Sequence, residues 1–221
     1  LNSLVKDVDD YLEAYEPTRA GRAISDFVND NLSNWYVRLN RRRFWGGGMT
    51  EDKLSAYQTL YTCLETVAKL MAPIAPFYAD QLFLDLIAVT GRENVESVHL
   101  SDFPVYDESK IDKNLEERMQ MAQDVSSMVL ALRRKVNIKV RQPLQTIMVP
   151  VVDAHQQESI EAVKNLILNE VNVKELKFVD NTAGILVKKI KPDFKKLGPR
   201  YGKIMKALAA TIQTMSQEDI N

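Results

Sequence analysis

Three stretches of this 221-residue chain concentrate positively charged side chains, and they are the residues best suited to do chemistry. They contain Arg38, Arg41, Arg42 and Arg43, followed by Phe44 and Trp45; Arg133, Arg134, Lys135, Lys139 and Arg141; and, within residues 188–206, Lys195, Lys196, Arg200, Tyr201 and Lys203. A guanidinium group can bind a phosphate through two parallel hydrogen bonds, and an aromatic ring can stack on an unpaired base. These residue types therefore favour binding to a nucleic acid.

The distribution of charge supports the same interpretation. The net charge is only −1. Residues 1–30, however, hold seven acids against three bases, whereas residues 133–141 hold five bases and no acid. Segregation of the two signs suggests one face made for a polyanion. The alternatives are that each basic stretch is a solvated helix end, or that its arginines pair with acids of a neighbouring domain.

Other kinds of chemistry find little support in the sequence. His99 and His155 stand 56 positions apart and Cys63 is the single cysteine, so the spacing of a zinc site is missing. Cys63 lies in an apolar helical stretch and is expected to be a buried, inert thiol. The glycines at 46–48 lack the spacing of a phosphate-binding loop. We therefore expect binding rather than catalysis, with no metal or cofactor in this chain.

Helical spacing dominates residues 1–140. Apolar residues recur every three or four positions in three long stretches, which predicts amphipathic helices. The stretches are Ala20 to about Arg43, with Ile24, Val28, Leu32, Trp35 and Leu39; a segment after Thr50, with Leu54, Tyr57, Tyr61, Leu64, Ala68 and Met71; and a segment with Leu115, Met119, Ala122, Val125, Val129, Leu132 and Val136. In this interpretation Trp35 and Phe44 could belong to the core.

The connections between these helices can also be predicted. The glycines at 46–48 should end the first helix, with a positive φ at its C-terminal cap, and turn the chain back so that the first two helices pack antiparallel. Thr50 is expected to cap the second helix. Pro73 and Pro76 should end that helix and begin another that runs to about Val89, followed by a loop over residues 91–111.

The pattern changes after Pro143. Compact β-branched runs at residues 146–149 and 151–152, a helix over Glu158 to Leu168, and two strands at 173–179 and 185–190 predict a small α+β unit. Residues 195–200 are expected to form a basic loop and residues 201–215 a last helix. We thus predict a mainly α protein, with a helical bundle over residues 1–140 and an α+β subdomain over residues 141–221.

Five segments, in this order, resemble isoleucyl-tRNA synthetases, which are class I aminoacyl-tRNA synthetases. The segments are LSNWYVRLNRRRFW, YTCLETVAKLMAPIAPFYADQLF, SVHLSDFP, LRRKVNIKVRQPL and FKKLGPRYGKIMKAL, and together they extend from residue 32 to residue 208. The resemblance implies that residues 1–140 are the anticodon-binding bundle of such a ligase and that the α+β unit is a junction subdomain. Motifs of the catalytic domain are missing from this sequence, so no catalytic residue can be assigned.

The resemblance also implies roles for the three basic stretches. Each is expected to bind tRNA, although the stretch from Arg41 to Trp45 could instead face the catalytic domain of the parent enzyme. That enzyme would use ATP and Mg²⁺ to attach isoleucine to its tRNA in the cytoplasm. We expect a monomer with no membrane association. The alternatives are the equivalent part of a valyl-tRNA synthetase and a helical module that docks acidic proteins.

Overall fold

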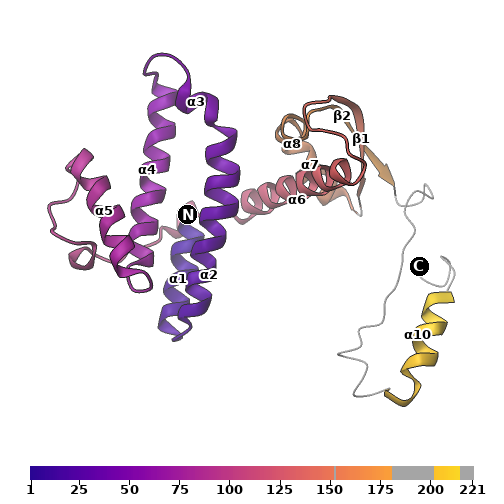
Figure 1. Cartoon of the computed structure of the whole chain (residues 1–221), viewed down its shortest axis with the longest axis horizontal. Helices are drawn as coiled ribbons and strands as arrows, with labels where there is room; N and C mark the ends of the chain where they lie inside the picture. The colour runs from indigo at the N-terminus through magenta and orange to yellow at the C-terminus, as the bar shows by residue number, and fades with distance from the viewer. Residues whose placement is uncertain (152, 181–201, 215–221) are drawn as a thin grey trace. The chain divides into compact units, whose positions relative to one another are not determined.

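The computed structural model describes residues 1–151, 153–180 and 202–214 (Figure 1). The chain divides into two compact units, Leu1–Lys113 and Asn114–Asn221. Helices dominate, and a small parallel sheet lies in the second unit, so the predicted fold class is confirmed. The long helix that was expected to close the bundle belongs to the second unit instead. The functional boundary at residue 140 stays a prediction, because compactness alone does not assign a function.

The regular elements described in the first unit are all helices, and loops connect them. Its elements are α1 (Asn2–Glu13), α2 (Pro17–Asp26), the π-helix η1 (Phe27–Val37), α3 (Arg41–Trp45), α4 (Glu51–Met71), α5 (Pro76–Thr90), and the 3₁₀ turns η2 (Val98–Leu100) and η3 (Glu108–Lys110). The Thr50 hydroxyl caps α4 by accepting a hydrogen bond from the Lys53 N–H at 3.1 Å. Helix α4 runs back beside α2, η1 and α3 (Figure 1), so the predicted antiparallel arrangement is confirmed.

Helix α4 lies at the centre of this unit because it contributes to two apolar clusters. Val67 and Leu70 pack with α1 and α2, whereas Ala68 and the C-cap residue Ala72 pack with α5 and η2. Leu54 and Tyr57, which were predicted to belong to the buried stripe, remain partly exposed. A helix that is covered on two sides buries small residues as well as large ones, and a single three-four stripe therefore describes it poorly.

The predicted helix from Ala20 to Arg43 is wrong in its continuity. Its middle is the π-helix η1, and the helical run stops at Asn40, before α3 begins. The Asn40 side-chain amide donates to the Tyr36 carbonyl at 2.8 Å, so the side chain shares an acceptor with the helix backbone. The five residues after the break form α3, and they include Arg41, Arg42 and Arg43 of the first basic stretch.

The second unit joins a helix to a β–α–α–β motif. Its elements are α6 (Lys113–Lys135), β1 (Leu144–Val151), α7 (Ala154–Ala162), α8 (Lys164–Val171), β2 (Val173–Asp180), η5 (Gly202–Ile204) and α10 (Met205–Thr214). Strands β1 and β2 are parallel, in a register that pairs Leu144 with Val173 and Ile147 with Leu176. Parallel strands need a crossover, and α7 and α8 supply it.

Several predictions for this unit need correction. The single helix expected over Glu158 to Leu168 is two helices with a break at Val163, and the two short runs near residue 150 are one strand. Strand β2 pairs in parallel with β1, and the second strand expected at 185–190 lies outside the described residues. The last helix is confirmed for residues 205–214, after a 3₁₀ turn. On α6, Ala122 and Val125 are buried, but Leu115 and Leu132 are exposed, as is Val136 directly after the helix.

Candidate nucleic-acid interface

The side chains of α3 point in different directions because the helix is short and its residues are consecutive. Phe44 is buried and packs edge to face against the rings of Tyr36 and Tyr57, with centroid distances of 6.2 and 5.2 Å. The Tyr57 hydroxyl donates to the Phe44 carbonyl at 3.1 Å. Phe44 therefore fixes the rotation of α3. Trp35 and Phe44 are both buried, so for these two side chains the structure bears out the alternative that the sequence left open.

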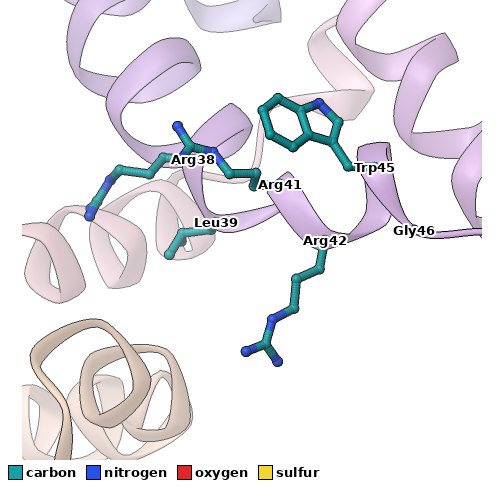
Figure 2. Close-up of a pocket in the computed structure, with 6 residues that line it drawn as sticks. All are labelled: Arg38, Leu39, Arg41, Arg42, Trp45 and Gly46. Atoms are coloured by element: carbon teal, nitrogen blue, oxygen red, sulfur yellow. The ribbon is translucent and has the colours of Figure 1, made fainter. Parts of the chain in front are cut away.

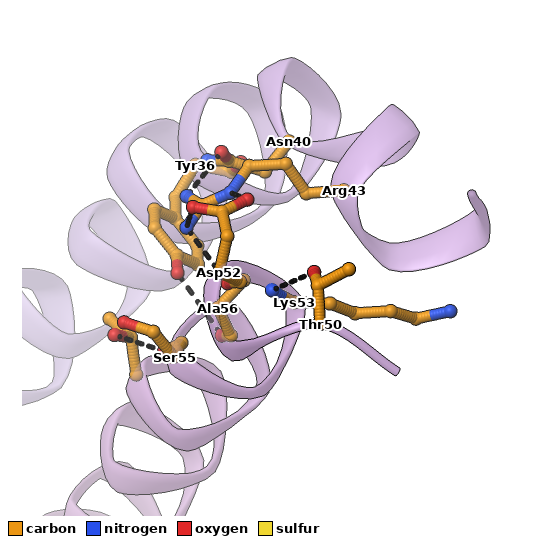
Figure 3. Close-up of polar contacts among 9 residues, drawn as sticks. Tyr36, Asn40, Arg43, Thr50, Asp52, Lys53, Ser55 and Ala56 are labelled. Atoms are coloured by element: carbon orange, nitrogen blue, oxygen red, sulfur yellow. Dashed lines mark hydrogen bonds and ion pairs between the residues drawn. The ribbon is translucent and has the colours of Figure 1, made fainter. Parts of the chain in front are cut away.

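Arg43 serves the fold. Its Nε and Nη2 donate to the two carboxylate oxygens of Asp52 at 2.8 and 2.7 Å, and Nη2 also donates to the Asp52 carbonyl at 3.0 Å (Figure 3). Its Nη1 donates to the Asn40 side chain at 2.9 Å. Hydrogen bonding to the Asp52 carboxylate raises the pKa of Arg43. Arg43 thus ties α3 to the first turn of α4. The sequence left open that these arginines pair with acids of a neighbouring domain; Arg43 does pair with an acid, but that acid lies in the same unit.

The other members of the first stretch surround an open concavity of about 620 Å³, lined by Arg38, Leu39, Arg41, Arg42, Trp45 and Gly46 (Figure 2). Trp45 is 79% exposed, and the Arg41 guanidinium lies 5.6 Å from the centre of its ring. Arg42 extends away from Arg41 and Trp45 (Figure 2). The Arg38 Nε donates to the Asn34 carbonyl at 2.8 Å. This end of α3 therefore offers a cationic group beside an exposed aromatic face.

The backbone conformation of the glycine turn after α3 differs from the predicted one. Gly46 follows α3 with φ −59° and ψ 160°, so no left-handed cap forms there. A Cβ atom at Gly46 would lie 2.9 Å from the Arg42 carbonyl oxygen, whereas a Cβ atom at Gly47 or Gly48 would meet nothing within 4 Å. Gly46 is required because the backbone passes close to α3, and the expected positive φ is wrong.

The second basic stretch lies at the C-terminal end of α6, where the chain reverses sharply. Asn137 adopts a left-handed conformation with φ 58°. The Ile138 N–H donates to the Arg133 carbonyl at 2.9 Å, and the Asn137 N–H donates to the Arg134 carbonyl at 3.2 Å. This pair of bonds is a Schellman motif, with asparagine in the position that glycine usually occupies. The motif starts the turn over residues 136–143 that leads into β1.

Arg133 was predicted to bind tRNA, but the structure buries it with only 3% of its surface exposed. Its Nη1 donates to the carbonyls of Lys139 and Gln142 at 3.1 and 3.0 Å, and its Nη2 donates to the Asn172 carbonyl at 3.1 Å. A guanidinium group enclosed in this way cannot reach a ligand. Arg133 is therefore removed from the set of RNA-contacting residues.

The remaining residues of the second stretch are exposed: Arg134, Lys135, Lys139 and Arg141. Of the third stretch, Lys195, Lys196, Arg200 and Tyr201 lie outside the described residues, and Lys203 lies in η5, where only its backbone is described. The α3 end belongs to the first unit and the α6 end to the second.

Three asparagines that shape these sites were missed by the sequence analysis. Asn40 breaks the helix before α3, Asn137 reverses the chain after α6, and Asn172 adopts φ 52° between α8 and β2. The residue type itself was the available signal. Among residues other than glycine, asparagine adopts the left-handed conformation most readily, and its side chain often bonds to nearby backbone groups.

Catalytic chemistry gains no support from the described residues. Cys63 is buried, as predicted, and burial raises the pKa of its thiol. Within residues 1–151, 153–180 and 202–214, no three His, Cys, Asp or Glu side chains gather in a way that could hold a metal ion. The same residues include no helix with the length and apolar character needed to span a membrane.

Comparison with known proteins agrees with this picture of a binding module. A family model described as the anticodon-binding domain of tRNA ligase matches residues 1–148. Isoleucine–tRNA ligases of Bacteroides fragilis and Porphyromonas gingivalis are 76% and 69% identical over 220 residues, which is 100% of this chain and 19% of each relative. That of Clostridium tetani is 39% identical over 217 residues, or 98% of this chain and 20% of the relative.

The chain thus spans about a fifth of the length of these relatives. The match to the family model covers all of the first unit, α6 and the turn that follows it, and so includes both exposed basic helix ends. The chain belongs to the family of anticodon-binding domains of tRNA ligases.

Proposed function

We propose that this chain is the part of an isoleucine–tRNA ligase that binds the anticodon arm of its tRNA. The proposal rests mainly on the cluster of exposed cations at the end of α6. Residues 133–141 contain no acid, and the exposed basic side chains there are Arg134, Lys135, Lys139 and Arg141. Phosphate contacts from such side chains supply most of the affinity of RNA-binding proteins and make it depend on salt. Because the chain belongs to a family of anticodon-binding domains, tRNA is the polyanion that we expect it to bind.

The end of α3 adds a second kind of contact. The exposed ring of Trp45 can stack on an unpaired base, while Arg41 and Arg42 can reach neighbouring phosphates. The anticodon loop is single-stranded, and it offers such bases. The alternative is that this end contacts the catalytic domain of the parent enzyme. A footprint of the chain on tRNA decides between them, because stacking on Trp45 would protect loop nucleotides and the Trp45→Ala variant would remove that protection.

The rest of the proposal concerns the parent enzyme. It would attach isoleucine to tRNA with ATP and Mg²⁺, using catalytic parts that lie outside this chain, and we propose that it works as a monomer in the cytoplasm. The identities of the relatives support isoleucine over valine. Charging of tRNA by the whole enzyme tests this choice, since faster transfer of valine than of isoleucine would favour the valyl alternative.

Binding of the chain to a labelled isoleucine tRNA transcript tests the central claim. We expect the double variant Arg134→Glu and Lys135→Glu to weaken binding at least tenfold, and affinity to fall steeply between 50 and 200 mM salt. Lys174→Glu is a matched control, because Lys174 is exposed on β2 outside the basic stretches. Its effect should be below threefold.

Two outcomes would contradict the proposal. One is binding that does not respond to salt, and the other is an equal loss of affinity in the control and in the double variant. A competition experiment addresses the protein-docking alternative. If an acidic protein binds the chain at physiological salt and excess tRNA fails to displace it, that alternative replaces the proposal.

A further inference from the structure

We propose that Arg133 is a positioning residue for RNA binding: its buried guanidinium holds the turn over residues 136–143, and this turn presents Lys139 and Arg141 to the phosphates. The inference rests on the proposed function, because it concerns how the α6 end meets RNA. It also reverses the role that the sequence suggests for Arg133, which moves from a direct contact to a support beneath the contacts.

The Arg133 guanidinium connects three separate parts of the chain. Its bonds reach three backbone carbonyls, and each belongs to a different part of the chain: Lys139 in the middle of the turn, Gln142 at its end, and Asn172 between α8 and β2. A planar group with donors in fixed directions can satisfy three such acceptors only in one arrangement. Arg133 therefore fixes the turn relative to α6 and to the start of β2.

Asn172 strengthens the same attachment. Its side-chain amide donates to the Val140 carbonyl at 2.8 Å, and its own carbonyl also accepts a hydrogen bond from the Leu144 N–H at 3.2 Å. Its left-handed φ of 52° allows the carbonyl and the side chain to serve the turn together. The turn is therefore held at Lys139, Val140, Gln142 and Leu144, which flank or include both exposed cations.

The nature of the partners matters for charge. Within the described residues, each hydrogen bond of the Arg133 side chain goes to a neutral carbonyl, so no hydrogen-bonded carboxylate neutralises its charge. A turn that is already ordered also loses less conformational freedom when RNA binds. Both effects favour binding through Lys139 and Arg141, although Arg133 itself touches no RNA.

A double-mutant cycle in the whole 221-residue chain tests the inference. Arg133→Met and Asn172→Gly are each combined with the double variant Lys139→Gln and Arg141→Gln, and binding to the isoleucine tRNA transcript is measured as a function of salt. Asn172→Gly removes one attachment of the turn, retains the left-handed backbone, and leaves the buried charge with its carbonyls. Asn172→Gly therefore replaces Arg133→Met in the cycle if the latter folds poorly. Circular dichroism monitors the fold of every variant.

We expect the Lys139 and Arg141 double variant to bind about tenfold more weakly and to lower the salt slope by about 1.5, for two lost phosphate contacts. Arg133→Met should weaken binding by about the same factor in the wild-type chain, but by less than twofold when the two cations are already gone. Arg133→Lys, which keeps the charge but donates from one nitrogen instead of from the two ends of a planar fork, should lie between the wild type and Arg133→Met. An equal loss in both backgrounds would show a general structural effect and overturn the inference.

Amide hydrogen exchange provides a readout that needs no RNA. Arg133→Met and Asn172→Gly should speed exchange in residues 136–144 while α7 and α8 keep their protection. Unchanged exchange in the turn would overturn the inference even if tRNA binding falls. If the wild-type chain binds no tRNA at all, the proposed function fails together with the binding half of the inference, and exchange still reports whether Arg133 holds the turn.

Discussion

The ends of α3 and α6 resemble each other in sequence, yet the fold uses their arginines in opposite ways. Each end has several consecutive basic residues, and at each end one arginine makes hydrogen bonds within its own unit. The two arginines differ in their burial and in the groups that they bind. At the end of α3, Arg43 pairs with the Asp52 carboxylate, and the two side chains stay 35% and 69% exposed. At the end of α6, Arg133 is almost fully buried and binds only carbonyls among the described residues.

The difference follows from what lies next to each helix end. Helix α3 is followed by a glycine loop and the acidic first turn of α4, so an acid stands within reach of Arg43. Helix α6 is followed by a turn without acids, and its carbonyls close around Arg133. An exposed ion pair contributes little to stability, whereas a buried group with several hydrogen bonds is costly to remove. Arginines in similar basic stretches therefore differ widely in how much their removal costs and in what they do.

The largest effect should come from replacing the buried arginine. Arg133→Met leaves the carbonyls of Lys139, Gln142 and Asn172 without their donor, and we expect the free energy of unfolding of the second unit to fall by about 3 kcal/mol. Urea denaturation followed by circular dichroism measures this change. Arg134→Met, at the neighbouring exposed position, is the matched control and should change stability by less than about 0.5 kcal/mol. Equal losses in the two variants would erase the distinction between the arginines.

The next effect concerns an aromatic group that only one of the two ends possesses. Trp45 is exposed beside Arg41, whereas residues 133–141 contain no aromatic side chain. Trp45→Ala should weaken binding to a single-stranded anticodon-loop oligonucleotide about tenfold, which is the usual contribution of one stacked base. Trp45→Phe should retain most of the affinity. Binding to a duplex without unpaired bases should not change in either variant, and a loss there would indicate that Trp45 acts through the fold.

The glycines offer a smaller effect that contrasts the two chain reversals. Gly46→Ala would place a Cβ atom 2.9 Å from the Arg42 carbonyl, so we expect the first unit to lose about 1 kcal/mol in thermal or urea unfolding. Gly47→Ala has open space and should be neutral or slightly stabilising. At the other end, Asn137→Gly should be tolerated and Asn137→Ala should not, because a positive φ is required there. Tolerance of Gly46→Ala would refute the close-approach argument.

The sequence predicted the elements more successfully than it predicted the sites. Three-four spacing identified α4 and α6 because amphipathic helices bury one side, and the prolines at 73 and 76 located the start of α5. The spacing failed on the exposed part of α4 because that helix packs on two sides. Charge clustering located both basic helix ends. It could not separate Arg43 or Arg133 from their neighbours, because burial and hydrogen bonding depend on segments distant in sequence, such as Asn172 for Arg133.

The smallest predicted effect tests whether Asp52 removes Arg43 from RNA binding. The guanidinium of Arg43 uses Nε, Nη1 and Nη2 within its own unit, so Arg43→Gln should reduce tRNA affinity less than twofold, whereas Arg42→Gln, which removes an exposed cation, should reduce it about threefold. Asp52→Asn removes the paired acid and should raise affinity slightly at low salt, with the gain disappearing at high salt because the added charge is screened. If Arg43→Gln instead costs as much as Arg42→Gln, the ion pair must open when RNA binds. In that case Arg43 would join the RNA-contacting residues, and only Arg133 would remain an arginine that supports its site from beneath.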